Sequence, residues 1–343
     1  MSDRELFLKD PNSGARSRGC RLARGIAPVL VAAACAACSS AAGTSSDAGP
    51  TDGGHGDTGA PDAGATDVES TDTQTDAANS AACGFVMPNP ASVGLPHPAS
   101  YHDNGDGTVT DLVTGLIWDH DASAMMLARA DAVAYCATRA PKWRLPTRIE
   151  LVSLVDFTVP NPGPTINGAA FPNTPGTVFW TSSPNLSNPM SAWSVSFDIG
   201  YSDYDDVSDQ GHARCVSVPA EAMHCFPQRY MAAAAGEIMD LATQLTWQQP
   251  PAPQPRAWAD AKTYCAGLGG SWRLPSMTEL QTLVDDRQSP ATIDPQAFPN
   301  TPAGVFWTSS PVAADIYAWA VDFSSGNTTN PDLSAANQVR CVH

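Results

Sequence analysis

The second half of the chain repeats the first half, and this repeat limits the possible folds more than any other feature of the sequence. Matching residues lie 129 positions apart early in the repeat and 126 positions apart at its end: Trp118 and Trp247, Cys136 and Cys265, Trp143 and Trp272, Trp193 and Trp319, Cys215 and Cys341. The small drift in spacing indicates short deletions in loops. A solenoid requires more and shorter units, so the sequence predicts two complete domains, at residues 83–217 and 218–343.

Both copies contain signals for two helices and several short strands. The capping boxes Thr147-x-x-Glu150 and Ser276-x-x-Glu279 predict that one helix begins at each hydroxyl residue. They explain the recurrence of Arg144 and Glu150 by architecture rather than by catalysis. The other helix is expected at 128–138 and 256–268, and strands are expected at 107–111, 116–118, 178–181, 192–197 and 318–323. Two helices followed by short strands predict an α+β domain.

Six of the nine cysteines lie in the repeated part, and an even number in an exported chain predicts a disulfide framework. We expect the helix cysteine of each copy to pair with the last-strand cysteine. The two cysteines that precede the copies are then left for each other, which gives the pairs Cys136–Cys215, Cys265–Cys341 and Cys83–Cys225. Each bond within a copy is expected to contribute ~2–4 kcal/mol, and the third bond would join the two copies.

The N-terminus has the features of a bacterial lipoprotein signal. Several arginines between positions 16 and 24 precede the apolar run Ile26–Ala37, which is well short of the ~20 residues that a membrane-spanning helix needs. The sequence that follows resembles a lipobox, and Cys38 or Cys35 is the expected lipidated cysteine. We therefore predict a signal peptide at 1–38 and a chain lipid-anchored to the bacterial outer membrane or cell surface. Plain secretion and a retained signal anchor are the alternatives.

The charge of the chain restricts its partners. Residues 39–82 are acidic and contain no Lys or Arg, and their Gly, Ser, Thr and Pro content predicts a disordered, extended tether. The whole chain has 35 acidic and 18 basic residues, with a formal net charge of −17. Binding of nucleic acid or an anionic membrane surface needs clustered Lys and Arg. We therefore expect no nucleic acid, membrane contact through the lipid anchor only, and no preference for anionic glycosaminoglycans.

Two acidic segments of the first copy are the candidates for metal binding. The segment from Asp103 to Asp106 is rich in oxygen ligands, as in part of a calcium loop, and Asp203, Asp205 and Asp206 form a second cluster. A Gly-rich turn and a solvated acidic loop explain both segments without a metal, because the complete calcium loop with its terminal Glu is missing. No cofactor is expected, and calcium is the only candidate ion.

No arrangement of polar residues in the sequence predicts catalysis. The seven His do not recur at matching positions, and the recurrent Thr181-Ser-Ser and Thr308-Ser-Ser have no recurrent His or Lys to act as a base. We therefore do not expect an enzyme. The recurrent tryptophans could line a sugar-stacking surface, but a core role is favoured for Trp143 and Trp272, Trp180 and Trp307, Trp193 and Trp319. The loops 198–210 and 324–337 differ between the copies and are the expected ligand face.

The order of motifs in each copy resembles the Lcl C-terminal domain family, formerly a domain of unknown function. The shared motifs are Gly-Thr-Val-x-Asp, Thr-Gly-Leu-x-Trp, Tyr-Cys, Trp-Arg-Leu-Pro-Thr-x-x-Glu-Leu, Trp-Thr-Ser-Ser, Trp-x-Val-x-Phe and Arg-Cys-Val, within about 100–217 and 228–343. The second copy departs at Gly236-Glu-Ile-Met-Asp240. The resemblance implies a fold similar to C-type lectins, a helix-to-last-strand disulfide, and adhesin-like roles that include binding of host polysaccharides. It implies no catalytic residue.

These features favour one functional class. We expect a pair of α+β, C-type-lectin-like domains that acts as a binding or adhesion module for a glycan or a surface protein. The Glu-Pro-Asn, Gln-Pro-Asp and Trp-Asn-Asp motifs of calcium-dependent lectins are absent from both copies, so sugar binding through calcium in that manner is not expected. A structural cell-envelope component without a soluble ligand is the alternative. The sequence identifies neither the ligand nor the oligomeric state.

Overall fold

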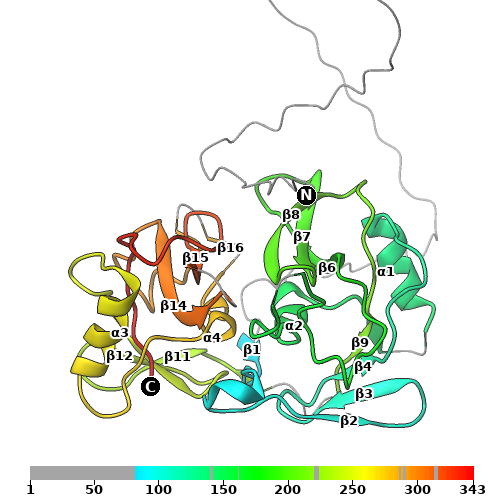
Figure 1. Ribbon diagram of the computed structural model, residues 1–343. Helices are drawn as coiled ribbons and strands as arrows, with labels where there is room; N and C mark the ends of the chain where they lie inside the picture. The colour runs from blue at the N-terminus through cyan, green and yellow to red at the C-terminus, as the bar shows by residue number, and fades with distance from the viewer. Residues whose placement is uncertain are drawn as a thin grey trace, which may run out of the picture. The chain divides into compact units, whose positions relative to one another are not determined.

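The computed structural model describes residues 82–139, 142–160, 162–219, 224–285, 287–288, 291–312 and 316–343 (Figure 1). The predicted signal peptide, the candidate lipidation sites Cys35 and Cys38, and all but the last residue of the predicted linker lie outside the described residues. The described residues all belong to one structural unit, Thr71–His343. Within this described part of the chain, every helix is too short or too polar to cross a bilayer.

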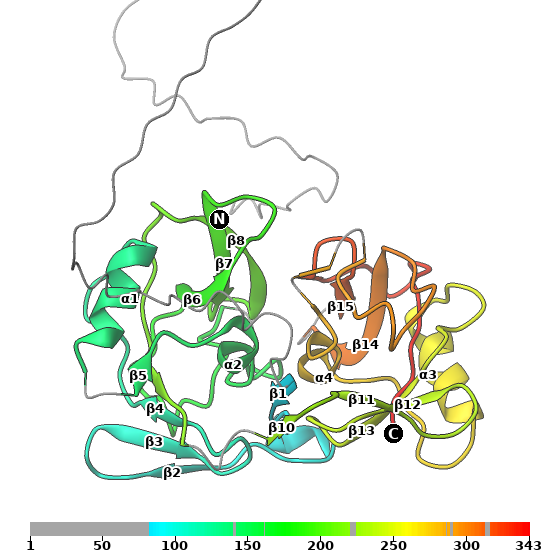
Figure 2. The same cartoon turned by 180° about the vertical axis from the view of Figure 1, so that it is seen from behind.

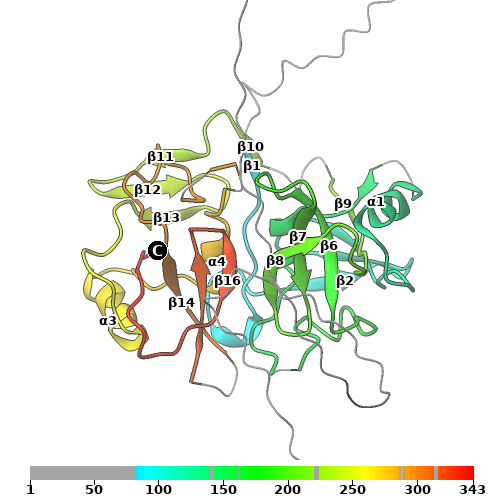
Figure 3. The same ribbon diagram turned by 90° about the horizontal axis from the view of Figure 1, so that it is seen from above.

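The first copy consists of two antiparallel sheets and two short helices. Its larger sheet has the strand order β2-β3-β4-β9-β5, and its smaller sheet has the order β6-β7-β8. Figure 3 shows the three strands of the smaller sheet next to one another. The pairing of β4 with β9 brings the beginning and the end of the copy together. The elements are β2 (Tyr101–Asp103), β3 (Thr108–Asp111), β4 (Ile117–Asp119), α1 (Arg129–Ala137), β5 (Trp143–Arg144), α2 (Arg148–Val152), β6 (Val178–Pro184), β7 (Ser191–Ser196), β8 (Tyr201–Asp206) and β9 (Val216–Ser217).

The second copy repeats this architecture. Its sheets have the orders β11-β12-β13 and β14-β15-β16, and Figure 2 shows the first of them from behind. The elements are β11 (Tyr230–Ala232), β12 (Glu237–Asp240), β13 (Leu245–Gln248), α3 (Trp258–Gly267), α4 (Met277–Gln281), β14 (Val305–Pro311), β15 (Ala318–Asp322) and β16 (Asn327–Thr329). Bridges from Val342 to Trp247 and Arg273 correspond to the pairing of β9 with β4 and β5. The prediction of two tandem α+β domains, each with two helices and short, mostly antiparallel strands, is therefore confirmed, and the helices are few and short.

The helices α2 and α4 begin where the capping boxes predicted. The Thr147 hydroxyl accepts a hydrogen bond from the Glu150 amide, and the Glu150 carboxylate accepts one from the Thr147 amide at 2.7 Å. Ser276 and Glu279 make the same reciprocal pair. Each helix has only five residues and is followed by a turn. The capping box therefore provides hydrogen-bond partners for a large share of the backbone N–H groups in so short a helix.

Each capping glutamate also binds the arginine that recurs ahead of it. Arg144 donates to both carboxylate oxygens of Glu150 at 2.6 and 2.8 Å, and Arg273 binds Glu279 in the same way at 2.7 Å on both sides. Such a two-bond pair has a fixed orientation, so it locks the segment before the helix onto the first turn. The architectural role predicted for Arg144 and Glu150 is confirmed.

Two of the three predicted disulfides are present. Cys136 on α1 is bonded to Cys215, with 5.4 Å between the Cα atoms, and Cys265 on α3 is bonded to Cys341, with 5.5 Å. All four cysteines are fully buried. Each bond therefore ties the inner face of the longer helix to the last segment of its own copy.

The third predicted disulfide concerns two strands that precede the copies. Strand β1 (Ala82–Gly84) pairs antiparallel with β10 (His224–Phe226), and the register places Cys83 directly opposite Cys225. Directly opposite residues have Cα atoms about 4.5–5.5 Å apart, which lies within the range of disulfides. We expect peptide mapping without reductant to recover one peptide pair that contains both cysteines. A peptide that joins Cys83 to Cys136 would contradict this pairing.

The two copies share part of their hydrophobic core. Met277, Val312 and Trp319 of the second copy belong to the buried cluster that fills the first copy. The contact is reciprocal at two equivalent glycines with positive φ, Gly200 and Gly326. A Cβ atom at Gly326 would lie 3.2 Å from Trp193, and one at Gly200 would lie 3.7 Å from Trp319. Each tryptophan thus lies against the glycine of the other copy.

Polar contacts between β8 and β16 surround this shared core. The Ser202 amide donates to the Thr328 hydroxyl at 2.8 Å, Asn327 donates to Asp203 at 2.6 Å, and the Tyr204 hydroxyl donates to a carbonyl near β16 at 2.9 Å. The loops 198–210 and 324–337 were expected to form the ligand face. Their first halves bind each other across the contact between the copies, and the ligand face stays a prediction.

Candidate functional site

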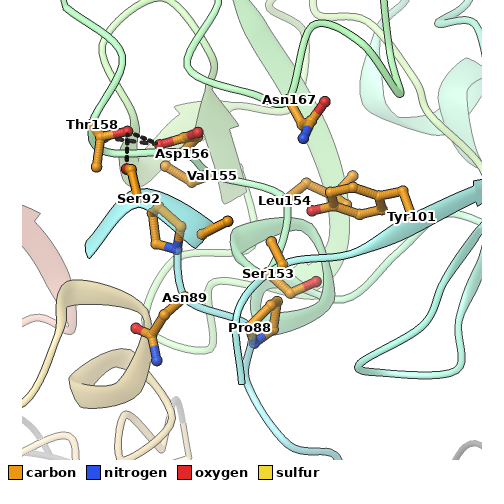
Figure 4. A pocket seen from close by; sticks show the side chains of 13 residues that line it. Pro88, Asn89, Ser92, Tyr101, Ser153, Leu154, Val155, Asp156, Thr158 and Asn167 are labelled. Atoms are coloured by element: carbon orange, nitrogen blue, oxygen red, sulfur yellow. Dashed lines mark hydrogen bonds between the residues drawn. The ribbon is translucent and has the colours of Figure 1, made fainter. Parts of the chain in front are cut away.

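A polar hollow of about 300 Å³ lies between β2 and the turn after α2 in the first copy. Figure 4 shows Tyr101 and Asn167 on one side of it and Ser92, Asp156 and Thr158 on the other. Apart from the Asp156 carboxylate, the polar groups around it are hydroxyls and amides. The full set is Pro88, Asn89, Pro90, Ala91, Ser92, Ala99, Tyr101, Ser153, Leu154, Val155, Asp156, Thr158 and Asn167. We call this cavity the first hollow.

Local hydrogen bonds and ring packing fix the walls of the first hollow. The backbone amide of Asp156 donates to the Thr165 carbonyl at 2.9 Å, and its carboxylate accepts from the amide and hydroxyl of Thr158 at 3.0 and 2.6 Å. The Tyr101 ring packs edge-on against Phe171, with 5.3 Å between the ring centres. The site is therefore preformed, with oxygen atoms on opposite walls.

A second hollow occurs at the equivalent place in the second copy, with a volume of about 910 Å³. The residues that line both hollows correspond at the spacing of the repeat: Tyr101 and Tyr230, Leu154 and Leu283, Val155 and Val284, Asp156 and Asp285, Thr158 and Arg287, Asn167 and Asp294. Pro184 and Leu186 of the first copy also line the second hollow. The fold thus forms one kind of polar site twice.

The two hollows differ in positive charge. Arg229 and Arg287 line the second hollow, whereas Ser100 and Thr158 occupy the equivalent positions in the first copy. Arg229 binds the fully buried carboxylate of Asp240 with two hydrogen bonds of 3.0 and 2.6 Å. Arg287 is largely exposed and binds Asp285 at 2.9 and 3.1 Å.

Asp111 is the equivalent of Asp240, but no arginine among the described residues of the first copy binds it. One carboxylate oxygen of Asp111 accepts from the amides of Val113 and Thr114 at 2.9 and 3.3 Å. The other oxygen is buried and has no hydrogen-bond partner among the described residues. Burial raises the pKa of Asp111 above its usual range, and the two amides together with the Thr114 side chain offset this only in part. Tyr101 lies directly opposite Asp111 in the strand pair. Its pKa is also raised, mainly by burial and further by the negative charges of Asp111 and Asp156.

This arrangement predicts a pH dependence of stability. In the unfolded chain Asp111 loses its proton near pH 3.9, but in the fold it keeps the proton to higher pH. The free energy of unfolding should therefore fall as pH rises from the unfolded to the folded pKa. We expect Asp111→Asn to raise this free energy by roughly 1 kcal/mol at pH 7 and to flatten the pH profile in urea titrations. Parallel profiles for the wild type and the variant would contradict the prediction, and the exposed Asp131→Asn serves as control.

The structure uses the predicted calcium ligands in turns and strand contacts. Asp103 accepts from the Gly105 amide at 2.9 Å, and Asp106 accepts from Thr108 at 3.0 and 2.6 Å. In the other cluster, Asp205 accepts from Ser194 at 2.5 Å, and Asp206 accepts from Ser208 at 2.9 and 2.7 Å. Within the described part of the chain, no three His, Cys, Asp or Glu side chains come close enough to hold a metal ion. Calcium binding stays a prediction.

The core role predicted for the recurrent tryptophans holds for two of the three pairs. Trp180 and Trp307 are fully buried and donate their ring N–H to backbone carbonyls at 2.9 and 2.8 Å. Trp193 and Trp319 are buried at the contact between the copies. Trp143 and Trp272 are only half-buried, and they lie outside both hollows.

Some residues of the structure were missed by sequence reasoning. Arg214 and Arg340, in the Arg-Cys-Val motif, are fully buried. Arg214 donates to the Thr174 hydroxyl at 2.6 Å, and Arg340 donates to the Thr301 hydroxyl at 2.6 Å. Burial lowers the pKa of Arg214 to about 10 and that of Arg340 to about 9. The hollows were missed too, although a tyrosine and an aspartate recur at both of them 129 residues apart.

The fold and its duplicated hollow define the chain as a tandem pair of small disulfide-bonded α+β domains. The Lcl C-terminal domain family matches residues 107–217 and 236–343, one match in each copy. The chain therefore belongs to this family, with two tandem copies of the domain. No curated protein matches the chain.

Proposed function

We propose that this chain is a surface-anchored lipoprotein whose two Lcl C-terminal domains act as a binding or adhesion module for a glycan or a surface protein. The observation that carries the proposal is the recurrence of one polar hollow in both copies. Two sites on one molecule can engage a multivalent surface together, which raises the overall affinity without new contacts. No catalytic activity is part of this proposal.

The N-terminal sequence supports the anchor in this proposal. The basic residues, the short apolar run and the cysteines Cys35 and Cys38 are what lipidation and export require. Mass spectrometry of the mature N-terminus would identify the lipidated cysteine. An unmodified N-terminus after a cleaved signal would favour plain secretion instead.

We also propose that each copy has a C-type-lectin-like fold. Two features support this proposal. A disulfide joins a helix to the last segment of each copy, and the pairing of β4 with β9 brings the ends of the first copy together. Fold alone does not determine function, so the hollows rather than the scaffold carry the functional proposal.

The test is binding of the oxidised chain to an array of glycans and matrix proteins. The test variant combines Asp156→Asn and Asp285→Asn, which removes one carboxylate from each hollow. Its matched control combines Asp131→Asn and Asp260→Asn, because these exposed acids occupy equivalent positions in α1 and α3. We expect a specific array signal that the test variant loses and the control keeps. The folded wild type binding nothing would favour a structural envelope component, and signal retained in the test variant would exclude the hollows.

A further inference from the structure

The second copy shows which chemical group fits beside the buried aspartate of this fold. There the guanidinium of Arg229 donates two parallel hydrogen bonds to Asp240 and a third to the Thr282 carbonyl at 2.9 Å. A planar guanidinium matches a carboxylate in this two-bond geometry better than an ammonium does. Arg229 also lines the second hollow, so the guanidinium lies between the hollow and the buried carboxylate.

The first copy keeps the acceptors of this arrangement and lacks its donors. Asp111 is fully buried, with one oxygen atom unpartnered among the described residues. Its side chain shares a face of the sheet with Tyr101, its directly paired neighbour, which lines the first hollow. Ser153, the equivalent of Thr282, lines the same hollow. Among the described residues that line it, none is Lys or Arg.

We infer that the first hollow binds the guanidinium group of an arginine side chain on a partner protein. This inference rests on the proposed binding function and names its ligand class. Asp156 makes the direct ion pair, the Tyr101 hydroxyl on the opposite wall accepts a further hydrogen bond, and Asp111, the cross-strand neighbour of Tyr101, adds attraction. The volume of about 300 Å³ admits one side chain rather than an extended chain. The formal net charge of −17 favours a basic partner surface.

The experiment is calorimetric titration of the oxidised full chain with L-argininamide as the probe. L-citrullinamide, its neutral counterpart of the same shape, is expected to bind at least about tenfold more weakly. L-lysinamide and glucosamine test whether the hollow binds an ammonium group instead, either of a protein or of an amino sugar. Equal binding of argininamide and citrullinamide, or tighter binding of glucosamine, would overturn the inference. No detectable binding at about 10 mM argininamide would overturn it as well.

Two variants and one matched control locate the site. Ser100→Arg with Thr158→Arg places the two arginines of the second copy in the first copy, and we expect it to lose argininamide binding while its thermal melting shows a folded chain. Asp156→Asn is expected to weaken binding at least about tenfold even where the double variant folds poorly. Asp131→Asn removes an exposed carboxylate of α1 that lines neither hollow, and it should leave argininamide binding unchanged. Argininamide binding that is retained in Asp156→Asn would overturn the assignment of the arginine site to the first hollow. An array signal that persists without any argininamide binding would overturn this inference but leave the proposed binding function in place.

Discussion

Replacing Trp193 with alanine is expected to lower the free energy of unfolding by about 3–5 kcal/mol. The side chain is fully buried, packs on Tyr204 with 4.1 Å between the ring centres, and lies 4.8 Å below the Arg148 guanidinium. It also lies against Gly326 of the second copy. Truncation therefore leaves a cavity at the contact between the copies, which the flanking strands cannot fill. Urea denaturation of the oxidised chain measures the loss.

Trp143→Ala is the matched control for this prediction. Trp143 belongs to the same recurrent set of tryptophans but is only half-buried, so its loss should cost clearly less. Gly326→Val tests the same contact with Trp193 from the second copy. A Cβ atom there would lie 2.8 Å from Val284 and 3.2 Å from Trp193, on a backbone with φ of +83°. Equal losses for Trp193→Ala and Trp143→Ala would show that the shared core contributes little.

Replacing Arg229 with serine is expected to destabilise the chain by about 3 kcal/mol. The change gives the second copy the residue that the first copy has at the equivalent position, Ser100. It leaves the fully buried Asp240 carboxylate without the guanidinium that binds it at 3.0 and 2.6 Å. Removing one partner of a buried pair is costly because the other charge stays desolvated. Thermal and urea unfolding at pH 7 measure the effect.

Adding Asp240→Asn to Arg229→Ser is expected to recover much of this loss, because the uncompensated charge is then gone. The double-variant cycle separates the charge pairing from the packing of the arginine stem. A loss that Asp240→Asn does not relieve would assign the effect to packing alone.

Local sequence signals predicted the elements of the fold well. The capping boxes at Thr147 and Ser276 act within four residues, so they are readable without tertiary structure. The helix containing Cys265 was expected at 256–268, and it ends just before Gly269, which has a positive φ. The two disulfides within the copies were also predictable, because the repeat divides the cysteines into equivalent sets.

The hollows and the contact between the copies were not predictable in the same way. Tyr101 and Asp156 lie 55 positions apart in the sequence and meet only after the strands and the turn after α2 have packed. A strand was predicted at 192–197, but both of its faces are buried: Trp193 and Val195 on one side, and Ala192 and Ser194 on the other. The sequence of one copy by itself does not indicate that the other copy packs against this strand.

The shared core also sets an order of events during synthesis. The 126 residues after Ser217 contain every residue of the second copy that covers Trp193. At ~5–20 residues per second, they follow the first copy by roughly 6–25 s. During that interval a finished first copy exposes a tryptophan that only the rest of its own chain can cover, so a chain truncated after the first copy would display an apolar surface to chaperones and proteases.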